Sequence, residues 1–550
     1  MKKLFLLSLA MLCFVYYYSF SALTGDGTAG NPWIIDEVSD LEEIMANTTD
    51  PGDNNFWNDY MELRTDLNLT GATVSPIGNE VTYFTGCFIG KGYTISNIDY
   101  NMTATDYVGF FGYIDGSANI GFEGVISNLN LENVNADGKQ KVGSFAGYCK
   151  GGRISGCTSS GNASAEEWYV GSFIGVTENS RLTNCTANGN ATGVSHIGGF
   201  IGDNQSSSIY CCSATGNAVS FPAGDPDNDE WYVGGFVGWN NESIISNCSA
   251  SGSATGKYDV GAFAGFNGES TITNSTASGN ATGIFRVGGF TGNNYSVNNF
   301  FNSIIRNCSS SGTASGTGSL GGFVGQNIYG TIEYCSANGN ANSLVDITSW
   351  SDIGGFAGWN SGGIIKQCYS TGNASCNTTA SVVCAVGGFV GINEGANIEN
   401  CFSTGNARDN VNNTYNYIGG FAGYDYNSIT EYCFSYGNVS SANNATLGGF
   451  IGYFDSGNYS CCFWNGSANP VLFDSGNIYD LGDEVTPLTE SEFSNQSSFA
   501  CFDFDNTWIM AGGKPVLTAL TIPTLTEWAV ILFIGLLAGV GSWFVWKRLA

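Results

Sequence analysis

Basic residues are scarce in this chain. Its 550 residues include 17 Lys and Arg against 47 Asp and Glu, which leaves a net charge of -30. Binding a nucleic-acid backbone requires clusters of Lys and Arg that neutralise phosphates, and the sequence has no such cluster. We therefore expect no nucleic-acid partner.

Histidine is almost absent, because His196 is the single one in the chain. The 18 cysteines include no Cys-x-x-Cys pair of the kind that zinc sites use, so the sequence predicts no zinc site and no cofactor. A lone histidine beside a repeat is more typical of a structural position than of a catalytic one.

Paired carboxylates at recurring positions are also lacking. Glycoside hydrolysis needs two facing carboxyl groups, but the pairs Glu166-Glu167 and Asp503/Asp505 have no counterparts in neighbouring repeats. The Lys and Arg residues that a lyase would use are scattered. We therefore predict a protein that is not an enzyme, with a carbohydrate-active lyase or glycosidase as the alternative.

Long apolar runs occur near the two ends of the sequence. Residues 1–22 combine two lysines, an apolar stretch and two small serines, which predicts a secretory signal peptide. The segment Ala529–Trp546 is long enough to cross a bilayer as a helix. Lys547 and Arg548 follow it and would stay in the cytoplasm, which places the preceding chain outside the cell.

Between these ends a Gly-rich hexapeptide, Val/Ile/Leu-Gly-Gly/Ser/Ala-Phe-x-Gly, recurs every 27 to 36 residues. An Ile/Leu-x-x-Cys-x-Ala/Ser-x-Gly-Asn-Ala pattern follows most copies, and helical periodicity is absent. Each repeat would hold two clear short strands and a third in its variable part. The repeated phenylalanines are Phe111, Phe145, Phe173, Phe200, Phe236, Phe263, Phe290, Phe323, Phe356, Phe389, Phe421 and Phe450.

Repeats of this length are too short for a four-stranded propeller blade, which needs about 40 residues or more. One coil of a parallel β-helix fits better, because stacked coils bury apolar side chains that one repeat cannot bury alone. The sequence therefore predicts an all-β parallel β-helix of about twelve coils with caps at both ends and one C-terminal transmembrane helix. The expected boundaries are 1–22 (signal peptide), 24–107 (N-terminal cap and first coils), 108–463 (repeats), 464–521 (C-terminal cap) and 522–550 (sorting signal with helix 529–546 and basic tail).

The repeats resemble the GLUG motif family, as in Tyr232-Val-Gly-Gly-Phe-Val-Gly238 paired with Ile245-Ser-Asn-Cys248. The resemblance covers about residues 24–520. It implies a β-helical, adhesin-like protein exposed at the cell surface, and it identifies no catalytic residue.

Ten cysteines occupy one slot of the repeat, and Ser275 occupies the same slot once. Alternation along a strand puts each one on the same face as a small residue two positions later, which predicts a buried stack. These thiols could pack as such or pair between coils. Cys376 and Cys384, eight residues apart in an insertion, are a better disulfide candidate. The ten are Cys157, Cys185, Cys212, Cys248, Cys308, Cys335, Cys368, Cys401, Cys433 and Cys462.

If the cysteines face inward, the residue after each faces outward, and in the last coils it is aromatic: Tyr369, Phe402, Phe434 and Phe463. We call these four residues the aromatic stripe. An exposed stripe would bind sugars or a partner chain, whereas loops could instead cover it.

The densest acidic loop, Asp225-Pro-Asp-Asn-Asp-Glu230, offers Asp225, Asp227 and Asp229 as weak calcium ligands. A solvated acidic loop explains it more simply. The many Asn-x-Ser/Thr triplets allow glycosylation, but turn geometry alone explains Gly-Asn at a coil corner.

The tail Ile522-Pro-Thr-Leu-Thr-Glu-Trp528 resembles the IPTL-CTERM sorting signal, a relative of PEP-CTERM tails, through Ile522, Pro523, Thr524, Leu525 and Trp528. This implies processing by an exosortase-like membrane protease, with a plain membrane anchor as the alternative. The sequence thus predicts an exported cell-surface protein that contacts glycans, surfaces or neighbouring proteins, or else a passive component of the cell envelope.

Overall fold

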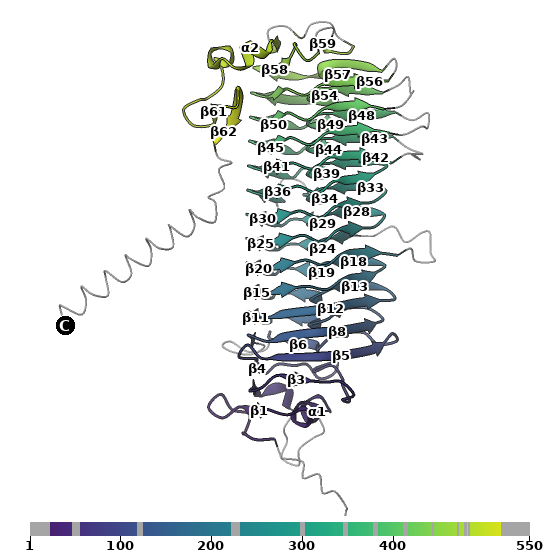
Figure 1. The fold of residues 1–550 in the computed structure, drawn as a ribbon, viewed down its shortest axis with the longest axis vertical. Coiled ribbons are helices and arrows are strands. Elements are labelled where there is room, and N and C mark those ends of the chain that lie inside the picture. The colour runs from purple at the N-terminus through teal and green to yellow at the C-terminus, as the bar shows by residue number, and fades with distance from the viewer. Residues whose placement is uncertain are drawn as a thin grey trace, which may run out of the picture.

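The computed structural model describes residues 23–46, 56–117, 125–221, 232–297, 303–344, 350–377, 383–410, 416–442, 445–469, 472–477, 481 and 484–518. In it the chain winds into a parallel β-solenoid of about 13 turns, which rises from the N-terminal to the C-terminal end in Figure 1. The predicted all-β parallel solenoid is therefore confirmed.

One coil contains five short strands rather than the two or three that the sequence predicted. Each strand pairs in parallel with its equivalents in the coils before and after it. The chain turns sharply before each cysteine of the repeat, where Asn247, for example, has a φ of 56°. Asparagine tolerates this left-handed conformation better than most residues. In this coil the strands are β23 (Val233–Gly234), β24 (Val237–Asn241), β25 (Ile244–Ser246), β26 (Ser249–Ala250) and β27 (Ala254–Thr255).

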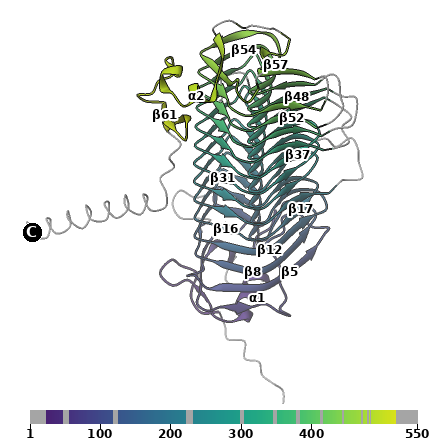
Figure 2. The same cartoon turned by 45° about the horizontal axis from the view of Figure 1, so that its top comes forward.

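One continuous ribbon of parallel strands along the rod contains the end of each hexapeptide and the residues that follow it. Figure 2 shows the strands of the rod stacked coil upon coil. They are β6 (Phe111–Asp115), β10 (Ala146–Lys150), β14 (Ile174–Glu178), β19 (Ile201–Gln205), β24, β29 (Ala264–Gly268), β34 (Thr291–Tyr295), β39 (Val324–Ile328), β44 (Ala357–Ser361), β49 (Val390–Glu394), β54 (Ala422–Glu431) and β57 (Thr446–Ser460).

A short strand precedes each of the ten ribbon strands from β10 to β54 and leads into it. These strands also stack in register, for example Val170 on Ile197 and Ile197 on Val233. They are β9 (Val142–Gly143), β13 (Trp168–Gly171), β18 (Ser195–Gly198), β23, β28 (Tyr258–Gly261), β33 (Phe285–Gly288), β38 (Ser319–Gly321), β43 (Ser351–Gly354), β48 (Cys384–Gly387) and β53 (Tyr417–Gly419).

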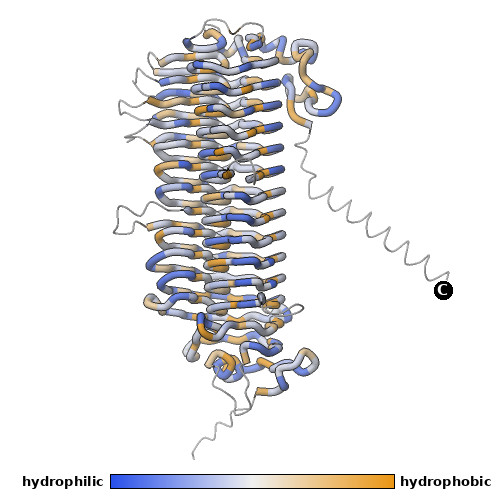
Figure 3. The backbone as a smooth tube through the Cα atoms, turned by 180° about the vertical axis from the view of Figure 1, so that it is seen from behind, coloured by the Kyte–Doolittle hydropathy of each residue, from blue (hydrophilic) through white to orange (hydrophobic). Residues whose placement is uncertain are grey.

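The twelve repeated phenylalanines form one buried column through the rod. Successive ring centroids are 4.5 to 5.6 Å apart, from Phe111 to Phe450. Each ring is at most 1% exposed. Equivalent side chains of successive repeats therefore lie above one another, as the predicted stack requires, and Figure 3 shows hydrophobic segments recurring from coil to coil.

A buried asparagine ladder runs beside this column, four residues after each of the seven phenylalanines from Phe200 to Phe389. The side-chain Nδ2 of each asparagine donates to the Oδ1 of the next at 2.7 to 3.0 Å. Each buried amide thus gains partners that replace water. The members are Asn204, Asn240, Asn267, Asn294, Asn327, Asn360 and Asn393.

The cysteine ladder is buried as predicted, and its ten members are free thiols. The backbone N–H of Cys401 donates to Cys433 Sγ at 3.4 Å, and the Cys401 thiol contacts the Glu399 carbonyl oxygen at 3.2 Å. Ser275 serves in the same way, because its Oγ accepts from the N–H of Cys248 at 3.2 Å. The ladder therefore packs and bonds to the backbone instead of forming disulfides between coils.

Close backbone contact explains the glycine of the Gly-Asn-Ala corners. A Cβ on Gly216 would lie 1.8 Å from the carbonyl oxygen of Gly189 in the coil before. The following asparagine also bonds between coils, since Asn217 Oδ1 accepts from the N–H of Ser253 at 2.9 Å. Glycine thus permits close backbone contact at these corners, and asparagine bonds one coil to the next.

The N-terminal end is closed by a short helix and the first coils. The helix starts at Val38, and the carboxylate of Asp40 accepts hydrogen bonds from the N–H groups of Asp36 and Glu37. The elements are β1 (Trp33–Ile35), α1 (Val38–Ala46), η1 (Phe56–Asn58), β2 (Tyr60–Leu63), β3 (Leu67–Asn68), β4 (Cys87–Ile89) and β5 (Thr94–Met102).

At the C-terminal end the chain first continues the solenoid and then folds back along its flank (Figure 1). Strands β58 (Cys462–Asn465), β59 (Phe473–Ser475) and β60 (Val485–Leu488) pair in parallel with the last coils. Residues 489–518, which we call the cover segment, pack outside the stack. They contain α2 (Glu490–Phe493), η3 (Gln496–Phe499) and the antiparallel strands β61 (Trp508–Ala511) and β62 (Lys514–Leu517).

The predicted fold class is wrong in its last element. No helix within the part of the chain that the structure describes is long and apolar enough to cross a membrane. The expected transmembrane helix over 529–546 lies outside the described residues.

Candidate binding surface

Two columns of side chains flank the phenylalanine column at the surface. The residues of the first column lie four positions before each phenylalanine in the sequence. Those of the second column lie three positions after it, except that Tyr113 lies two positions after Phe111. The columns face each other, since the rings of Tyr232 and Trp239 are 4.5 Å apart. The first column is Tyr107, Lys141, Tyr169, His196, Tyr232, Asp259, Arg286, Ser319, Asp352, Ala385, Tyr417 and Thr446. The second is Tyr113, Tyr148, Val176, Asp203, Trp239, Phe266, Asn293, Gln326, Trp359, Ile392, Tyr424 and Tyr453.

Aromatic rings stack along the second column in the N-terminal half of the rod. Tyr113 and Tyr148 are 4.7 Å apart, and Trp239 and Phe266 are 4.1 Å apart with a 10° angle between their planes. The two coils between these pairs carry Val176 and Asp203 instead. The ring stack is therefore interrupted for two coils.

A hollow of about 390 Å³ opens beside this interruption. Aromatic rings and hydrogen-bonding groups line it together, and this combination is typical of small-ligand sites. The lining residues are Tyr107, Tyr113, Gln140, Lys141, Tyr148, Trp168, Tyr169, Val176, Asp203 and Gln205.

Asp203 is the buried polar group of this hollow, with 3% of its surface exposed. Its Oδ2 accepts a 2.9 Å hydrogen bond from Gln205 Nε2, and its Oδ1 has no partner among the described residues. Burial disfavours the charged form and raises the pKa of Asp203 to about 7. Its carboxyl group is therefore close to half protonated at neutral pH.

The first column supplies a cation and further rings around the same hollow. Lys141 Nζ contacts the Tyr107 hydroxyl at 3.2 Å and lies 4.6 Å from the centre of that ring. The ring of His196 lies 4.8 Å from Tyr169 and 5.0 Å from Tyr232. Desolvation among these rings lowers the pKa of His196 to about 3, so the imidazole is neutral and packs as an aromatic ring.

The aromatic stripe of the last coils is covered, not exposed. Tyr369 stacks on Phe402 at 5.0 Å, and Phe402 stacks on Phe434 at 4.9 Å. Phe463 joins Phe402 and Phe434 in a buried cluster with residues of the cover segment, chiefly Phe499 and Trp508. The stripe is therefore corrected from a possible binding surface to an interior contact, because a segment distant in sequence packs on it.

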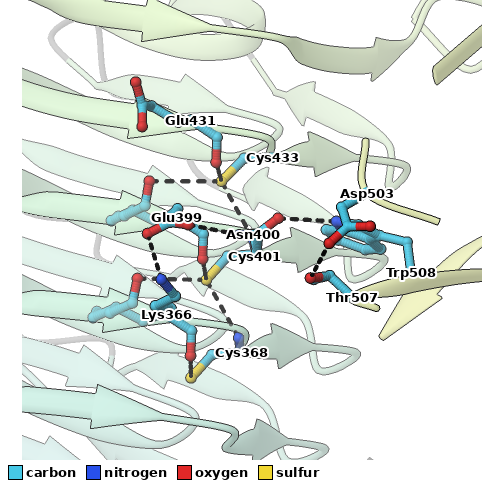
Figure 4. Close-up of polar contacts among 12 residues, drawn as sticks. Lys366, Cys368, Glu399, Asn400, Cys401, Glu431, Cys433, Asp503, Thr507 and Trp508 are labelled. Atoms are coloured by element: carbon cyan, nitrogen blue, oxygen red, sulfur yellow. Dashed lines mark hydrogen bonds and ion pairs between the residues drawn. The ribbon is translucent and has the colours of Figure 1, made fainter. Parts of the chain in front are cut away.

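Two further contacts hold the cover segment on the flank. Trp508 Nε1 donates to Asn400 Oδ1 at 3.0 Å, beside the cysteine ladder (Figure 4). A disulfide joins Cys461 in the last coils to Cys501. The sequence did not indicate this pair, since neither cysteine belongs to the repeat slot.

The other predicted sites have different outcomes. The structure joins Cys376 and Cys384 in a disulfide, with Cα atoms 6.5 Å apart. The weak calcium candidates Asp225, Asp227 and Asp229 lie outside the described residues. Within the described ranges no group of three His, Cys, Asp or Glu side chains could hold a metal ion.

The sorting motif also lies outside the described residues, with Ile522, Pro523, Thr524, Leu525 and Trp528. The same holds for the basic pair Lys547 and Arg548.

The carboxylates considered for catalysis have structural partners. Glu167 forms an ion pair with Lys139 at 3.6 Å. Asp503 accepts hydrogen bonds from the N–H groups of Asp505 and Asn506 within its own turn. Both acidic pairs therefore take part in local structure.

Comparison with known proteins identifies the repeat. The family model described as the GLUG motif matches residues 166–192, 229–255, 316–342, 351–375 and 383–408. The chain contains five GLUG motifs. The predicted GLUG resemblance is thus confirmed for these stretches, each of which lies in the solenoid.

Two known proteins are similar in sequence to part of this chain. Halomucin from Haloquadratum walsbyi is 31% identical over 140 residues, which are 23% of this chain and 1% of Halomucin. A protein from Evansella cellulosilytica, named a Gly-rich membrane protein, is 30% identical over 115 residues, 20% of this chain and 12% of that protein. This chain therefore spans a small part of the length of either relative.

One solved structure aligns along most of this chain. It is a protein from Bacteroides ovatus named an immunoglobulin A1 protease, with 14% identity over 90% of this chain and 94% of that one. Its TM-score is 0.21, so this likeness carries no argument about fold or activity.

The sequence pattern indicated the aromatic stripe of the last coils but not the two columns. A signal for them exists, because both keep a constant offset from the hexapeptide phenylalanine in most repeats. The interruption at Val176 and Asp203 is visible only when these offsets are aligned coil by coil.

Proposed function

We propose that this protein is an exported cell-surface β-solenoid that works by contact, as an adhesive or structural rod. The observation that carries the proposal is the interrupted aromatic surface of the early coils, where rings and hydrogen-bonding groups surround the hollow beside Asp203. A rod that stacks its core in register presents such a surface in a fixed geometry. The GLUG repeats, and similarity to Halomucin and to a protein named as a membrane protein, support a place at the cell surface.

Glycans are the favoured contact. Sugars present flat apolar C–H faces that pack on aromatic rings and hydroxyl groups that bond to carboxyl and amide groups. The hollow offers both, through Tyr148 and Trp168 on one hand and Asp203 and Gln205 on the other. Neighbouring proteins and bare surfaces are the other partners that the proposal allows.

A carbohydrate-active enzyme is the second candidate. The observation in its favour is the raised pKa of Asp203, since general acids need a pKa near the working pH. Glycoside hydrolysis also needs a second facing carboxyl group, whereas Asp203 Oδ2 bonds to the amide of Gln205. We therefore favour binding over catalysis.

The first experiment locates the protein on intact cells. Loss of the solenoid after brief external proteolysis, with a cytoplasmic marker preserved, would support surface display, and full protection of the solenoid would contradict it. A passive envelope component would show display without binding on a glycan array. Release of reducing sugar from a bound glycan would favour the enzyme instead.

Processing of the tail is a separate part of the proposal. The likeness of residues 522–528 to a sorting signal favours cleavage near Ile522 by an exosortase-like protease. The mass of the mature C-terminus tests this directly. A protein that retains Trp528 and Arg548 on the cell surface would exclude cleavage near the motif.

A further inference from the structure

The aromatic stack of the second column has a gap two coils long, where Val176 and Asp203 take the place of rings. Successive coils are about 4.8 Å apart, and rings occupy the column at Tyr113, Tyr148, Trp239 and Phe266. Tyr113 stacks on one face of Tyr148, while the small Val176 follows on the other side. A flat ring of ligand placed here would continue the stack.

The gap has polar groups that the rest of the stack lacks. Asp203 occupies the second vacant position, nearly fully buried and with one carboxyl oxygen unpaired among the described residues. Gln205, Gln140 and Lys141 line the same hollow and can donate hydrogen bonds. A buried polar atom without a hydrogen-bond partner costs free energy. A ligand hydroxyl that donates to this oxygen would remove that cost.

We propose that this hollow binds one or two sugar residues of a neutral oligosaccharide, with an apolar sugar face against Tyr148 and hydroxyl groups on Asp203 and Gln205. This inference rests on the proposed contact function and names its site and ligand class. A hollow of about 390 Å³ falls within the range of small-ligand pockets.

Charge favours a neutral ligand over an acidic one. The chain carries a net charge of -30, and the hollow contains a carboxyl group. The negative net charge of the chain would repel a uronic acid chain, and Lys141 is the one cation among the residues that line the hollow. The protonated form of Asp203, which is well populated below about pH 7, can in addition donate a hydrogen bond to a sugar oxygen.

Trp168 is the best residue for testing the site. It lines the hollow with 38% of its surface exposed, so truncation removes a contact surface without emptying the core. Trp350 is a matched control, because it is 49% exposed in a later coil, and five ribbon strands lie between β14 and β44. Asp203→Asn keeps the shape of the polar group and removes its acid function.

The experiment is calorimetric titration of the full-length protein in detergent with cellohexaose, maltohexaose and mannohexaose. We expect at least one of them to bind, Trp168→Ala to weaken that binding at least tenfold and Asp203→Asn at least threefold. Trp350→Ala should leave it within twofold. Equal unfolding midpoints for the variants and the parent protein ensure that any loss reports the site.

Several outcomes would overturn the site. These are no binding by any neutral hexasaccharide, equal binding by Trp168→Ala, or tighter binding of hexagalacturonate or of a proline-rich peptide. If a glycan array shows binding that Trp168→Ala does not alter, the contact function stands and this hollow is not its site. If neither the array nor the titration detects a ligand, both this site and glycan contact by the rod are excluded.

Discussion

The indole Nε1 of Trp508 donates a 3.0 Å hydrogen bond to Asn400 Oδ1, although 108 residues separate them in the sequence. Asn400 immediately precedes a member of the cysteine ladder, and Trp508 starts a strand of the cover segment. This contact ties a terminal segment to the flank of the stack. It also places the Trp508 ring 6.0 Å from Phe402 and 5.9 Å from Phe434 of the aromatic stripe.

Trp508→Ala should detach the cover segment. Trp508 is fully buried, and deleting a buried aromatic side chain costs about 3–5 kcal/mol. We expect rapid proteolytic cleavage within 489–518, measured by mass spectrometry, while the solenoid stays intact. Ile509→Ala is the control, since Ile509 is 44% exposed and should change little. Equal cleavage rates for the two variants would show that Trp508 does not anchor the segment.

The disulfide between Cys461 and Cys501 should stabilise the cover segment more strongly than the disulfide between Cys376 and Cys384 stabilises its own coil. The first closes a separation of 40 residues and the second one of 8. Loop closure predicts stabilisation of about 4 kcal/mol for the first and about 2.5 kcal/mol for the second.

Replacing Cys501 by Ala should therefore promote cleavage within 489–518 under oxidising conditions. Cys376→Ala should leave this cleavage unchanged, because that disulfide lies elsewhere in the stack. The prediction fails if reduction of the parent protein leaves the cleavage rate of the cover segment unaltered.

The ladder position of Ser275 should accept cysteine but reject valine. The N–H of Cys248 donates to Ser275 Oγ at 3.2 Å, as other ladder N–H groups donate to Sγ atoms. Ser275→Cys preserves an acceptor, whereas Ser275→Val leaves that N–H unpaired at a cost of about 1–3 kcal/mol. Unfolding midpoints in guanidinium chloride measure this difference. Equal midpoints for the two variants would contradict it.

Breaking the asparagine ladder at Asn267 should destabilise the middle of the rod. Asn240 Nδ2 donates to Asn267 Oδ1, and Asn267 Nδ2 donates to Asn294 Oδ1, both at 2.8 Å. Asn267→Leu leaves two buried polar groups unpaired, each at a cost of about 1–3 kcal/mol. Thermal unfolding measures the loss. Asn241→Ala, outside the ladder, should have little effect, and a comparable loss there would argue against a special role for the ladder.

The stability contribution of Asp203 should depend on pH. Its pKa is raised from 3.8 to about 7 by burial, so the folded protein holds the proton more tightly than the unfolded chain does. The favourable contribution is complete below pH 3.8 and is lost as the pH rises to about 7. Asp203→Asn removes this dependence.

The check compares unfolding midpoints of the parent protein and Asp203→Asn between pH 4 and pH 8. The parent protein should lose stability relative to the variant as the pH rises. This comparison is needed because Asp352 and Asp425 are also buried, with pKa values raised to about 7. A difference that does not vary with pH would show that Asp203 keeps an ordinary pKa.

The sequence by itself determined the stack. A hexapeptide at a period of about thirty residues carries an apolar side chain that one repeat cannot bury, so its copies must lie on one another. The positions of Phe111 to Phe450 and of the cysteine ladder follow from this rule and from strand alternation. The asparagine ladder follows as well, because its seven members keep a constant offset from the phenylalanines of their coils.

Only the tertiary structure decided what covers the stack and where it is interrupted. The sequence pattern of the aromatic stripe is the same whether solvent or protein covers it. The contact of Trp508 with Asn400 joins two segments that are far apart in the sequence, and no local pattern predicts it. The hollow beside Asp203 likewise depends on which side chains stand in adjacent coils. The period of the sequence specifies which residues stack on one another along the rod. The segment that covers the stack and the hollow in its surface arise from non-local packing, which has no period.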